Sequence, residues 1–147
     1  MIRTATSADV DRIFELICEL AIFEKLEHKL VGTAEMLRAA LFGDPATAWC
    51  VVYEVDGVVQ AYALYYFTFS TFRVLPGIWL EDLYVTPTLR GQGIGRQLID
   101  HLVEIAKARG HGRVEWSVLD WNVDAINFYK KIGAEILEDW RICRVSL

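Results

Sequence analysis

Residues 80–98 read LEDLYVTPTLRGQGIGRQL, and this stretch decides the fold. It begins as a strand, continues through a glycine-rich loop at residues 90–95, and leads into the helix with the clearest apolar periodicity in the chain. Glycines allow positive φ angles and let the backbone approach a ligand closely. The unpaired N–H groups at the start of a helix, together with the helix dipole, favour an anion. This order of elements therefore predicts a phosphate cradle that suits a pyrophosphate.

Two other glycine patterns do not fit this loop. Counted from Gly91 the sixth residue is Arg96, and from Gly93 it is Leu98, so the dinucleotide pattern G-x-G-x-x-G is missing. No Gly-Lys-Ser/Thr follows, which rules out a P-loop. On the glycines alone, a tight turn that binds nothing remains an alternative.

Working outward from this loop, hydrophobic periodicity and turn residues predict helices and strands on both sides. The first helix begins near Thr6, which with Asp9 resembles a capping box. Asp56-Gly57 predicts a two-residue hairpin turn. Further helices are expected at residues 33–42, 93–109 and 122–132, the first capped by Thr33 and the last by Asn122. Strands are expected at residues 49–55, 58–69, 78–85, 113–119 and 140–145. A loop is expected at residues 70–77. The order indicates an α+β fold with a mixed sheet.

Length, composition and charge narrow the class of protein. The chain of 147 residues is 54% hydrophobic and 24% charged, which predicts one globular domain, 1–147. The formal net charge of −5 argues against nucleic acid as a partner. No apolar run approaches the roughly 20 residues of a membrane span, and the N-terminus lacks the apolar core of a signal peptide. We therefore expect no membrane partner.

The cysteines and histidines point to neither disulfides nor a metal. Cys18, Cys50 and Cys143 are far apart and odd in number, as expected of reduced thiols in a cytoplasmic protein. The three histidines show no metal-ligand spacing with cysteines or acids. The sequence predicts a cytoplasmic protein without a metal site.

Arg90-x-x-Gly93-x-Gly95 resembles the acetyl-CoA signature of the GNAT superfamily of N-acetyltransferases. The resemblance covers nearly the whole chain. Within the superfamily, the sequence is similar to the diamine (spermidine/spermine and thialysine) acetyltransferase branch. The other segments that carry it are residues 21–24, 63–67, 80–85, 120–122 and 127–130. It implies the GNAT fold: a mixed, mostly antiparallel central sheet with splayed middle strands, often at a bulge, and flanking helices. It also implies homodimers.

The resemblance assigns cofactor and catalytic roles. The co-substrate is acetyl-CoA, and no metal is involved. The matching cofactor-binding positions are Leu83, Tyr84, Val85, Arg90, Gly91, Gln92, Gly93, Ile94, Gly95, Arg96, Asn122, Asp124 and Ala125. Tyr129 matches the family's general acid, and Glu81 matches the position proposed for its water-mediated base.

These two roles agree with the chemistry of the reaction. An alkyl ammonium has a pKa of about 10.4 and must lose a proton before it attacks a thioester, most simply to a carboxylate through water. A tyrosine hydroxyl can protonate the leaving thiolate. An exposed strand-end acid remains the alternative for Glu81, and an ordinary core tyrosine the alternative for Tyr129.

The acceptor is expected to be a small cationic amine. The candidate acceptor-site residues are Phe23, Glu24, Glu81, Asp82, Glu115, Trp116, Ser117 and Glu138, with Glu27 as a further acid. Glu27 and Glu138 are equally compatible with solvated surface charge. Residues 70–72, Ser-Thr-Phe, stand where the polyamine enzymes carry an acid and a Trp, and look more like the thialysine type. A non-catalytic acyl-CoA-binding module and an acetyltransferase of protein or peptide amines remain alternatives.

Overall fold

The computed structural model describes residues 1–147. The chain divides into two compact units, Met1–Trp116 and Ser117–Leu147, each of which is described by itself. In the first unit the helices are η1 (Ser7–Asp9), α1 (Val10–Phe23), η2 (Glu27–Lys29), α2 (Ala34–Phe42), η3 (Pro87–Leu89) and α3 (Ile94–Ala108), and the strands are β1 (Ile2–Thr4), β2 (Trp49–Val55), β3 (Val58–Ser70), β4 (Leu75–Val85) and β5 (Val114–Glu115). None of the helices has both the length and the apolar character that a membrane span requires.

The five strands form one sheet in the order β1-β2-β3-β4-β5. The first three pairings are antiparallel and the β4–β5 pairing is parallel, which confirms the mixed, mostly antiparallel sheet expected from the sequence. The hairpin between β2 and β3 turns at Asp56 (φ 49°) and Gly57 (φ 78°), the two positive angles that the Asp-Gly pair predicts. The loop expected at residues 70–77 is shorter, because β3 extends to Ser70 and β4 begins at Leu75.

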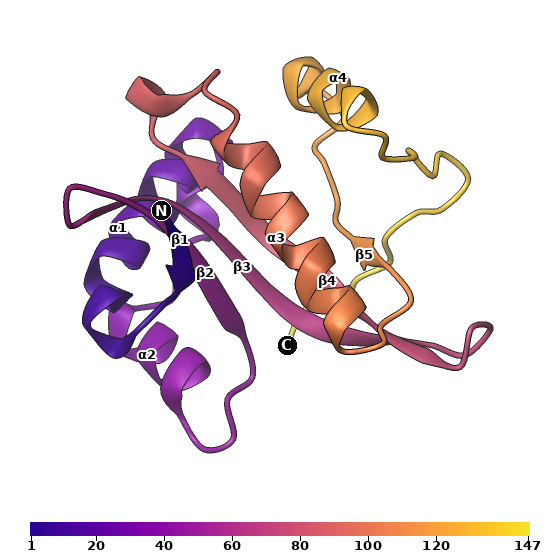
Figure 1. The fold of residues 1–147 in the computed structure, drawn as a ribbon, viewed down its shortest axis with the longest axis horizontal. Helices are drawn as coiled ribbons and strands as arrows, with labels where there is room; N and C mark the ends of the chain where they lie inside the picture. Colours follow the sequence, from indigo (N-terminus) through magenta and orange to yellow (C-terminus); the bar gives the residue numbers. More distant parts are fainter. The chain divides into compact units, whose positions relative to one another are not determined.

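Helices flank the sheet on both sides, as Figure 1 shows for α1 and α2 on one side and α3 on the other. The core on the α1 and α2 side combines alternate strand residues such as Val52, Tyr62 and Tyr84 with Ile13 and Leu16 of α1. From α3 the buried residues are Ile94, Leu98, Ile99, Leu102 and Ala106, a helical stripe. Burial of these apolar surfaces is the main stabilising contribution to the unit.

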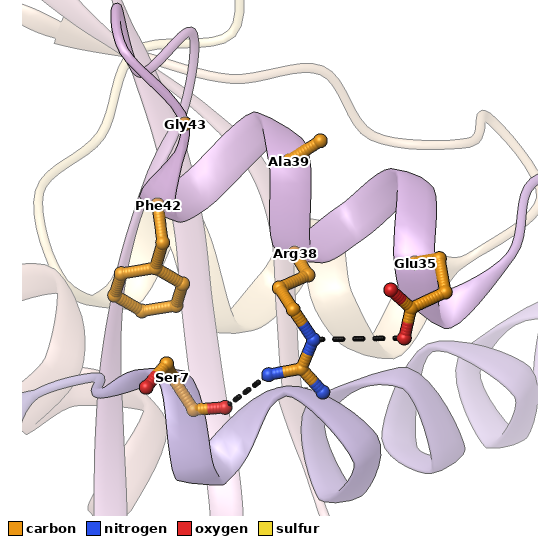
Figure 2. A pocket seen from close by; sticks show the side chains of 6 residues that line it. All are labelled: Ser7, Glu35, Arg38, Ala39, Phe42 and Gly43. Carbon is orange, nitrogen blue, oxygen red and sulfur yellow. Dashed lines mark hydrogen bonds and ion pairs between the residues drawn. The ribbon is translucent and has the colours of Figure 1, made fainter.

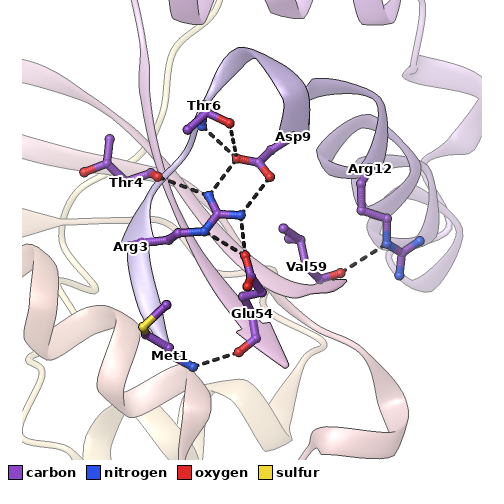
Figure 3. A network of polar contacts seen from close by, with 8 residues as sticks. All are labelled: Met1, Arg3, Thr4, Thr6, Asp9, Arg12, Glu54 and Val59. Atoms are coloured by element: carbon purple, nitrogen blue, oxygen red, sulfur yellow. Dashed lines mark hydrogen bonds and ion pairs between the residues drawn. The ribbon is translucent and has the colours of Figure 1, made fainter. Parts of the chain in front are cut away.

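The short strand β1 was not expected from the sequence, and a charge network holds it against β2 (Figure 3). Arg3 donates to both oxygens of Asp9, at 2.7 and 2.9 Å, and to the carboxylate of Glu54 on β2. Asp9 also accepts from the backbone N–H of Thr6 at 2.7 Å, and the capping box predicted for Thr6 and Asp9 is present. Three residues that include an arginine give no recognisable strand pattern, so only the partner strand reveals β1.

The pairing between β3 and β4 contains a bulge. Leu64 lies opposite Asp82 and Tyr65 opposite Leu80, so Glu81 is the extra residue on β4. On the other edge of β4, the ladder to β5 consists of Ile78 and Trp79 alone and ends two residues before the bulge. A bulge bends its strand and increases the local twist. The parallel ladder to the edge strand β5 thus stops two residues before β4 bends.

The second unit contains one helix, α4 (Val123–Lys131). Its N-cap is Asn122, whose side chain accepts from the N–H of Ala125 at 3.3 Å, as the sequence predicts. Two strand predictions are wrong: β5 covers only Val114–Glu115 of the expected 113–119, and residues 140–145 form no strand. High β-propensity does not make a strand without a hydrogen-bonded neighbour, and residues 140–147 are exposed.

Candidate functional site

The loop between β4 and α3 has the backbone geometry of an anion cradle. Gly91 and Gly93 have φ angles of 78° and 79°, which side-chain-bearing residues rarely adopt. Gly93 is the N-cap of α3 and no side chain caps the helix. The first intrahelical bond comes from the N–H of Gln97, so the preceding N–H groups of the helix have no intrahelical acceptor. These donors lie at the positive end of the helix dipole.

The surroundings of this loop fit the pyrophosphate of a coenzyme. A Cβ atom added at Gly91 or Gly93 would meet nothing within 4 Å, so the backbone is open to close approach. Gly91, Gln92 and Gly93 are exposed. Arg96, in the first turn of α3, is ion-paired with Asp100 at 2.8 Å and adds a basic group at the same end of the helix. The loop can therefore bind a dianionic group through its backbone.

Arg90 joins the loop to the end of α1. Its Nε donates to the carbonyl of Val85 at 3.0 Å. Its guanidinium carbon lies 4.9 Å from the ring centre of Phe23 and 5.3 Å from that of Tyr84. The Tyr84 hydroxyl donates in turn to Glu19 of α1 at 2.9 Å. These contacts place Phe23, a predicted acceptor-site residue, beside the predicted cofactor loop. Glu19 was not anticipated, because its partner lies 65 residues further along the chain.

Three acids gather where α1 ends and β4 bends. Asp82 accepts from the hydroxyl of the fully buried Tyr62 at 3.4 Å. Burial, together with the charges of Glu81 and Glu24, raises the pKa of Asp82 to about 6. Burial likewise raises the pKa of Glu24. The structure thus brings together Glu24, Glu81 and Asp82, with no cation paired to Asp82 among its perturbing groups. Such a carboxylate cluster is suited to an ammonium ligand or to proton transfer.

Glu81, the bulge residue, is exposed. The indole N–H of Trp79 donates to Glu81 Oε2 at 3.1 Å. Trp79 was not singled out from the sequence, although residues two apart in a strand share a face and the signal was available. Leu83, Tyr84 and Val85 pair with β3 on one edge and lie beyond the two-residue ladder to β5 on the other.

The remaining acceptor-site predictions of the first unit lie apart from this acid cluster. Glu115 is on β5 and accepts from Arg113 at 2.8 Å. Trp116 is half-buried, at the end of the first unit. Glu27 is exposed in η2 and contributes to no ion pair of the structure. No contact joins Glu27 or Glu115 to Asp82, whose pKa responds to Glu81 and Glu24 instead.

The other predicted residues belong to the second unit and are described within it. Asp124 is an exposed acid in the first turn of α4, and Ala125 donates to the Asn122 cap. Tyr129 is half-buried, with its ring centre 5.4 Å from that of Phe128. Ser117 and Glu138 are exposed. Tyr129 and Glu81 thus belong to different units.

A shallow pocket of about 340 Å³ lies between η1 and α2 (Figure 2). Arg38 crosses it and donates to the carbonyl of Ser7 at 2.6 Å. None of the predicted site residues lines this pocket, which is bounded by Ser7, Glu35, Arg38, Ala39, Phe42 and Gly43. The structure contains no group of three or more His, Cys, Asp or Glu side chains arranged to bind a metal ion.

Comparison with known proteins identifies the class to which this fold and site belong. The model of the acetyltransferase (GNAT) family matches residues 11–134, so the chain belongs to that family. Among solved structures, an aminoglycoside acetyltransferase from an uncultured soil metagenomic sample, in complex with trehalose, superimposes with a TM-score of 0.83. That match covers 100% of this chain and 95% of the other at 18% identity, and therefore shows the fold alone.

The relatives in sequence narrow the branch. The thialysine N-epsilon-acetyltransferase of Mus musculus is 40% identical over 146 residues, covering 94% of this chain and 85% of the relative. The L-ornithine N5-acetyltransferase NATA1 of Arabidopsis thaliana is 30% identical over 190 residues, covering 99% and 83%. The chain is thus an N-acetyltransferase of amines, similar to the diamine and thialysine branch, as the sequence motifs indicate. Acetyl-CoA is the co-substrate typical of this family.

Proposed function

We propose that this enzyme transfers the acetyl group of acetyl-CoA directly to a primary amine of a small cationic acceptor, such as a diamine, a polyamine or a thialysine-like amino acid. The observation that carries the proposal is the bulge in β4. The bulge residue Glu81 is exposed and lies close to two partly buried acids, Asp82 and Glu24. The glycine loop and α3 follow the bulge in the chain. Acceptor and coenzyme sites are thus supported by one continuous segment.

In this proposal the acetyl-CoA site is built mainly from backbone. The pyrophosphate lies against residues 91–96 at the N-terminus of α3, where the open glycines and unpaired N–H groups fit it. The pantetheine arm pairs with the free edge of Leu83, Tyr84 and Val85, as a peptide adds to a sheet edge. An N–H group of that edge is also suited to stabilise the oxygen of the tetrahedral intermediate. Asn122, Asp124 and Ala125 contribute contacts to the coenzyme arm from the second unit.

Glu81 serves as the base in this mechanism. An alkyl ammonium with a pKa of about 10.4 is almost fully protonated at neutral pH, so the site must remove a proton before attack. An exposed carboxylate at the bulge can accept it through a water molecule. Asp82 and Glu24 add negative charge that attracts the cationic acceptor, with Phe23 beside them.

Tyr129 serves as the general acid that protonates the leaving thiolate. This role requires the two units to act as one domain. The family match supports that requirement, because it runs from residue 11 to residue 134 and crosses the division after Trp116. Glu115, Trp116, Ser117 and Glu138 complete the acceptor site in the proposal. We further propose that the protein is cytoplasmic and forms a homodimer. Light scattering of the purified protein would test the homodimer.

Among acceptors, the proposal favours a thialysine-like or short diamine substrate. Two relatives in this branch are named for thialysine and ornithine, each of which carries a side-chain amine. A spermidine/spermine N(1)-acetyltransferase-like protein of Homo sapiens is 34% identical over 99% of this chain, although over only 22% of its own length. The Ser70-Thr71-Phe72 segment supports the thialysine type.

The test is to mix the enzyme with acetyl-CoA and a panel of thialysine, ornithine, short diamines, spermidine, lysine and a peptide, and to follow release of the CoA thiol. We expect release with one class of small diamine, and a loss of about a hundredfold or more in Tyr129→Phe, because the thiolate then lacks its acid. Acetyl-CoA binding without release for any amine would favour a binding module. Release with the peptide alone would indicate protein or peptide acceptors.

A further inference from the structure

Trp79 and Glu81 form a contact that the family motif does not explain. They lie two residues apart on β4, so their side chains project from the same face of the strand. The indole N–H of Trp79 donates to Glu81 Oε2 at 3.1 Å. An indole nitrogen can only donate, and an ionised carboxylate can only accept. The contact therefore fixes the direction of one of the carboxylate oxygens.

The sheet holds Trp79 but not Glu81. Trp79 lies in register between Tyr66 of β3 and Glu115 of β5, which gives it a partner strand on each side. Glu81 is the bulge residue, so it has no opposite residue on β3, and its side chain is exposed. An exposed glutamate has several rotamers available, and ordering it carries an entropic cost. A donor on the rigid part of the strand reduces that freedom.

We propose that Trp79 is a positioning residue, whose indole N–H directs the Glu81 carboxylate for removing the proton of the acceptor amine. The inference rests on the proposed function, because it gives Trp79 a role only where Glu81 is the base. The proton moves from the acceptor ammonium through water to Glu81, while the indole N–H stays bonded to the other carboxylate oxygen. Trp79 therefore exchanges no proton in the reaction.

Other titratable groups surround the contact between Trp79 and Glu81. Asp82 lies next to Glu81 on β4, and Glu24 from the end of α1 acts on the same group of acids. Tyr66 of β3 lies opposite Trp79, and burial raises the pKa of its hydroxyl, with the charge of Glu81 as the second cause. On β5, Glu115 is paired with Arg113.

Trp79→Phe tests the proposal, because phenylalanine keeps an aromatic ring in the strand and removes the donor. The measurement is kcat/KM for the preferred amine from acid to alkaline pH at saturating acetyl-CoA. We expect a fall of roughly three- to tenfold near neutral pH, the size of one charge-assisted hydrogen bond at an exposed site. The acid limb of the profile should move to higher pH by about half a unit to one unit, by the same reasoning.

Trp49→Phe is the matched control. Trp49 lies on β2 and packs against Phe67 with ring centres 4.5 Å apart, without contact to Glu81. The same substitution there should leave the acid limb in place. In a Glu81→Gln background, Trp79→Phe should change kcat/KM by less than about twofold, because the group it positions is gone.

A folded Trp79→Phe variant with an unmoved acid limb would overturn the inference, and so would full additivity with Glu81→Gln. If phenylalanine lowers the unfolding midpoint, benzothienylalanine placed at position 79 decides the question, since its sulfur replaces the N–H within the same shape. Wild-type protein that acetylates no amine would instead overturn the proposed function. Wild-type activity that depends on Glu81 but not on the Trp79 donor would overturn this inference alone.

Discussion

Asp9 and Asp82 are two poorly solvated aspartates of the first unit, and their pKa values move in opposite directions. Arg3 holds the pKa of Asp9 at about 2 through its hydrogen bonds, against the effect of burial. Burial and two neighbouring carboxylates raise the pKa of Asp82 to about 6. The charges around Asp9 are paired within the fold, whereas the charges around Asp82 are all negative. A fold retains an uncompensated group of acids at a cost in stability, which is typical of functional sites.

The largest expected effect on activity comes from neutralising Glu81, the exposed residue of the acid cluster that also contains Glu24 and Asp82. Glu81→Gln removes the proposed base without changing the size of the side chain. We expect kcat/KM for the preferred amine to fall about 100- to 1,000-fold, within the range of general base catalysis. Glu104→Gln is the matched control, since Glu104 is an exposed glutamate of α3 paired with Lys107. Activity within threefold of wild type in Glu81→Gln would remove Glu81 from the chemistry.

The next largest effect, on stability, comes from removing the cation that Asp9 and Glu54 share. Arg3→Met leaves Asp9 and Glu54 facing each other without their shared cation. We expect the free energy of unfolding to fall by about 2–3 kcal/mol, because a poorly solvated carboxylate loses its partner. Urea denaturation measures this, and Arg38→Met, which loses exposed ion pairs and an exposed hydrogen bond to the Ser7 carbonyl, should cost less than about 1 kcal/mol.

The loss of stability in Arg3→Met should have almost no effect on kcat. Arg3 contacts β1, η1 and β2 and none of the predicted site residues. Once folded, the Arg3→Met variant should keep its kcat within about twofold, since no group that acts in the transition state has changed. A large fall in kcat with an intact fold would show that the two regions are coupled, and would break the contrast between them.

The sequence predicts the parts of this molecule that depend on local chemistry. The caps at Thr33 and Asn122 and the Asp56-Gly57 hairpin follow from side chains that bond to nearby backbone or tolerate positive φ. By contrast, β1 and the short β5 depend on which strand lies beside them. Residues 140–145 have strong β-propensity but form no strand, because no partner strand lies beside them.

The candidate site divides in the same way. The glycine loop is visible in the sequence because its backbone angles and its helix are local. Glu81 was found through the family resemblance, while the bulge that exposes it depends on the register with β3. The raised pKa of Asp82 requires Tyr62 and the end of α1, which lie 20 and nearly 60 residues away in the chain. Electrostatics of this kind arises from tertiary contacts and cannot be derived from spacing.

The smallest effect, and the sharpest test of the contrast, is the pH dependence of stability at Asp82. Its folded pKa of about 6 lies above the ordinary value of 3.8, so the unfolded chain loses this proton first. Stability from this group is therefore full below pH 3.8 and is lost as the pH rises through about 6. Asp82→Asn cannot ionise, so the variant should gain roughly 2–3 kcal/mol on wild type between acid and neutral pH.

Asp9→Asn provides the opposite case within the same protein. The pKa of Asp9 is depressed to about 2, so its contribution is present above 3.8 and lost only as the pH falls towards 2. From pH 5 to neutral pH, the stability lost in Asp9→Asn should therefore stay constant, while the difference between Asp82→Asn and wild type grows. Urea denaturation at several pH values gives both curves. Parallel curves would mean that Asp82 is compensated in the folded protein as Asp9 is, and the acid group would then have no electrostatic reason to bind a cationic amine.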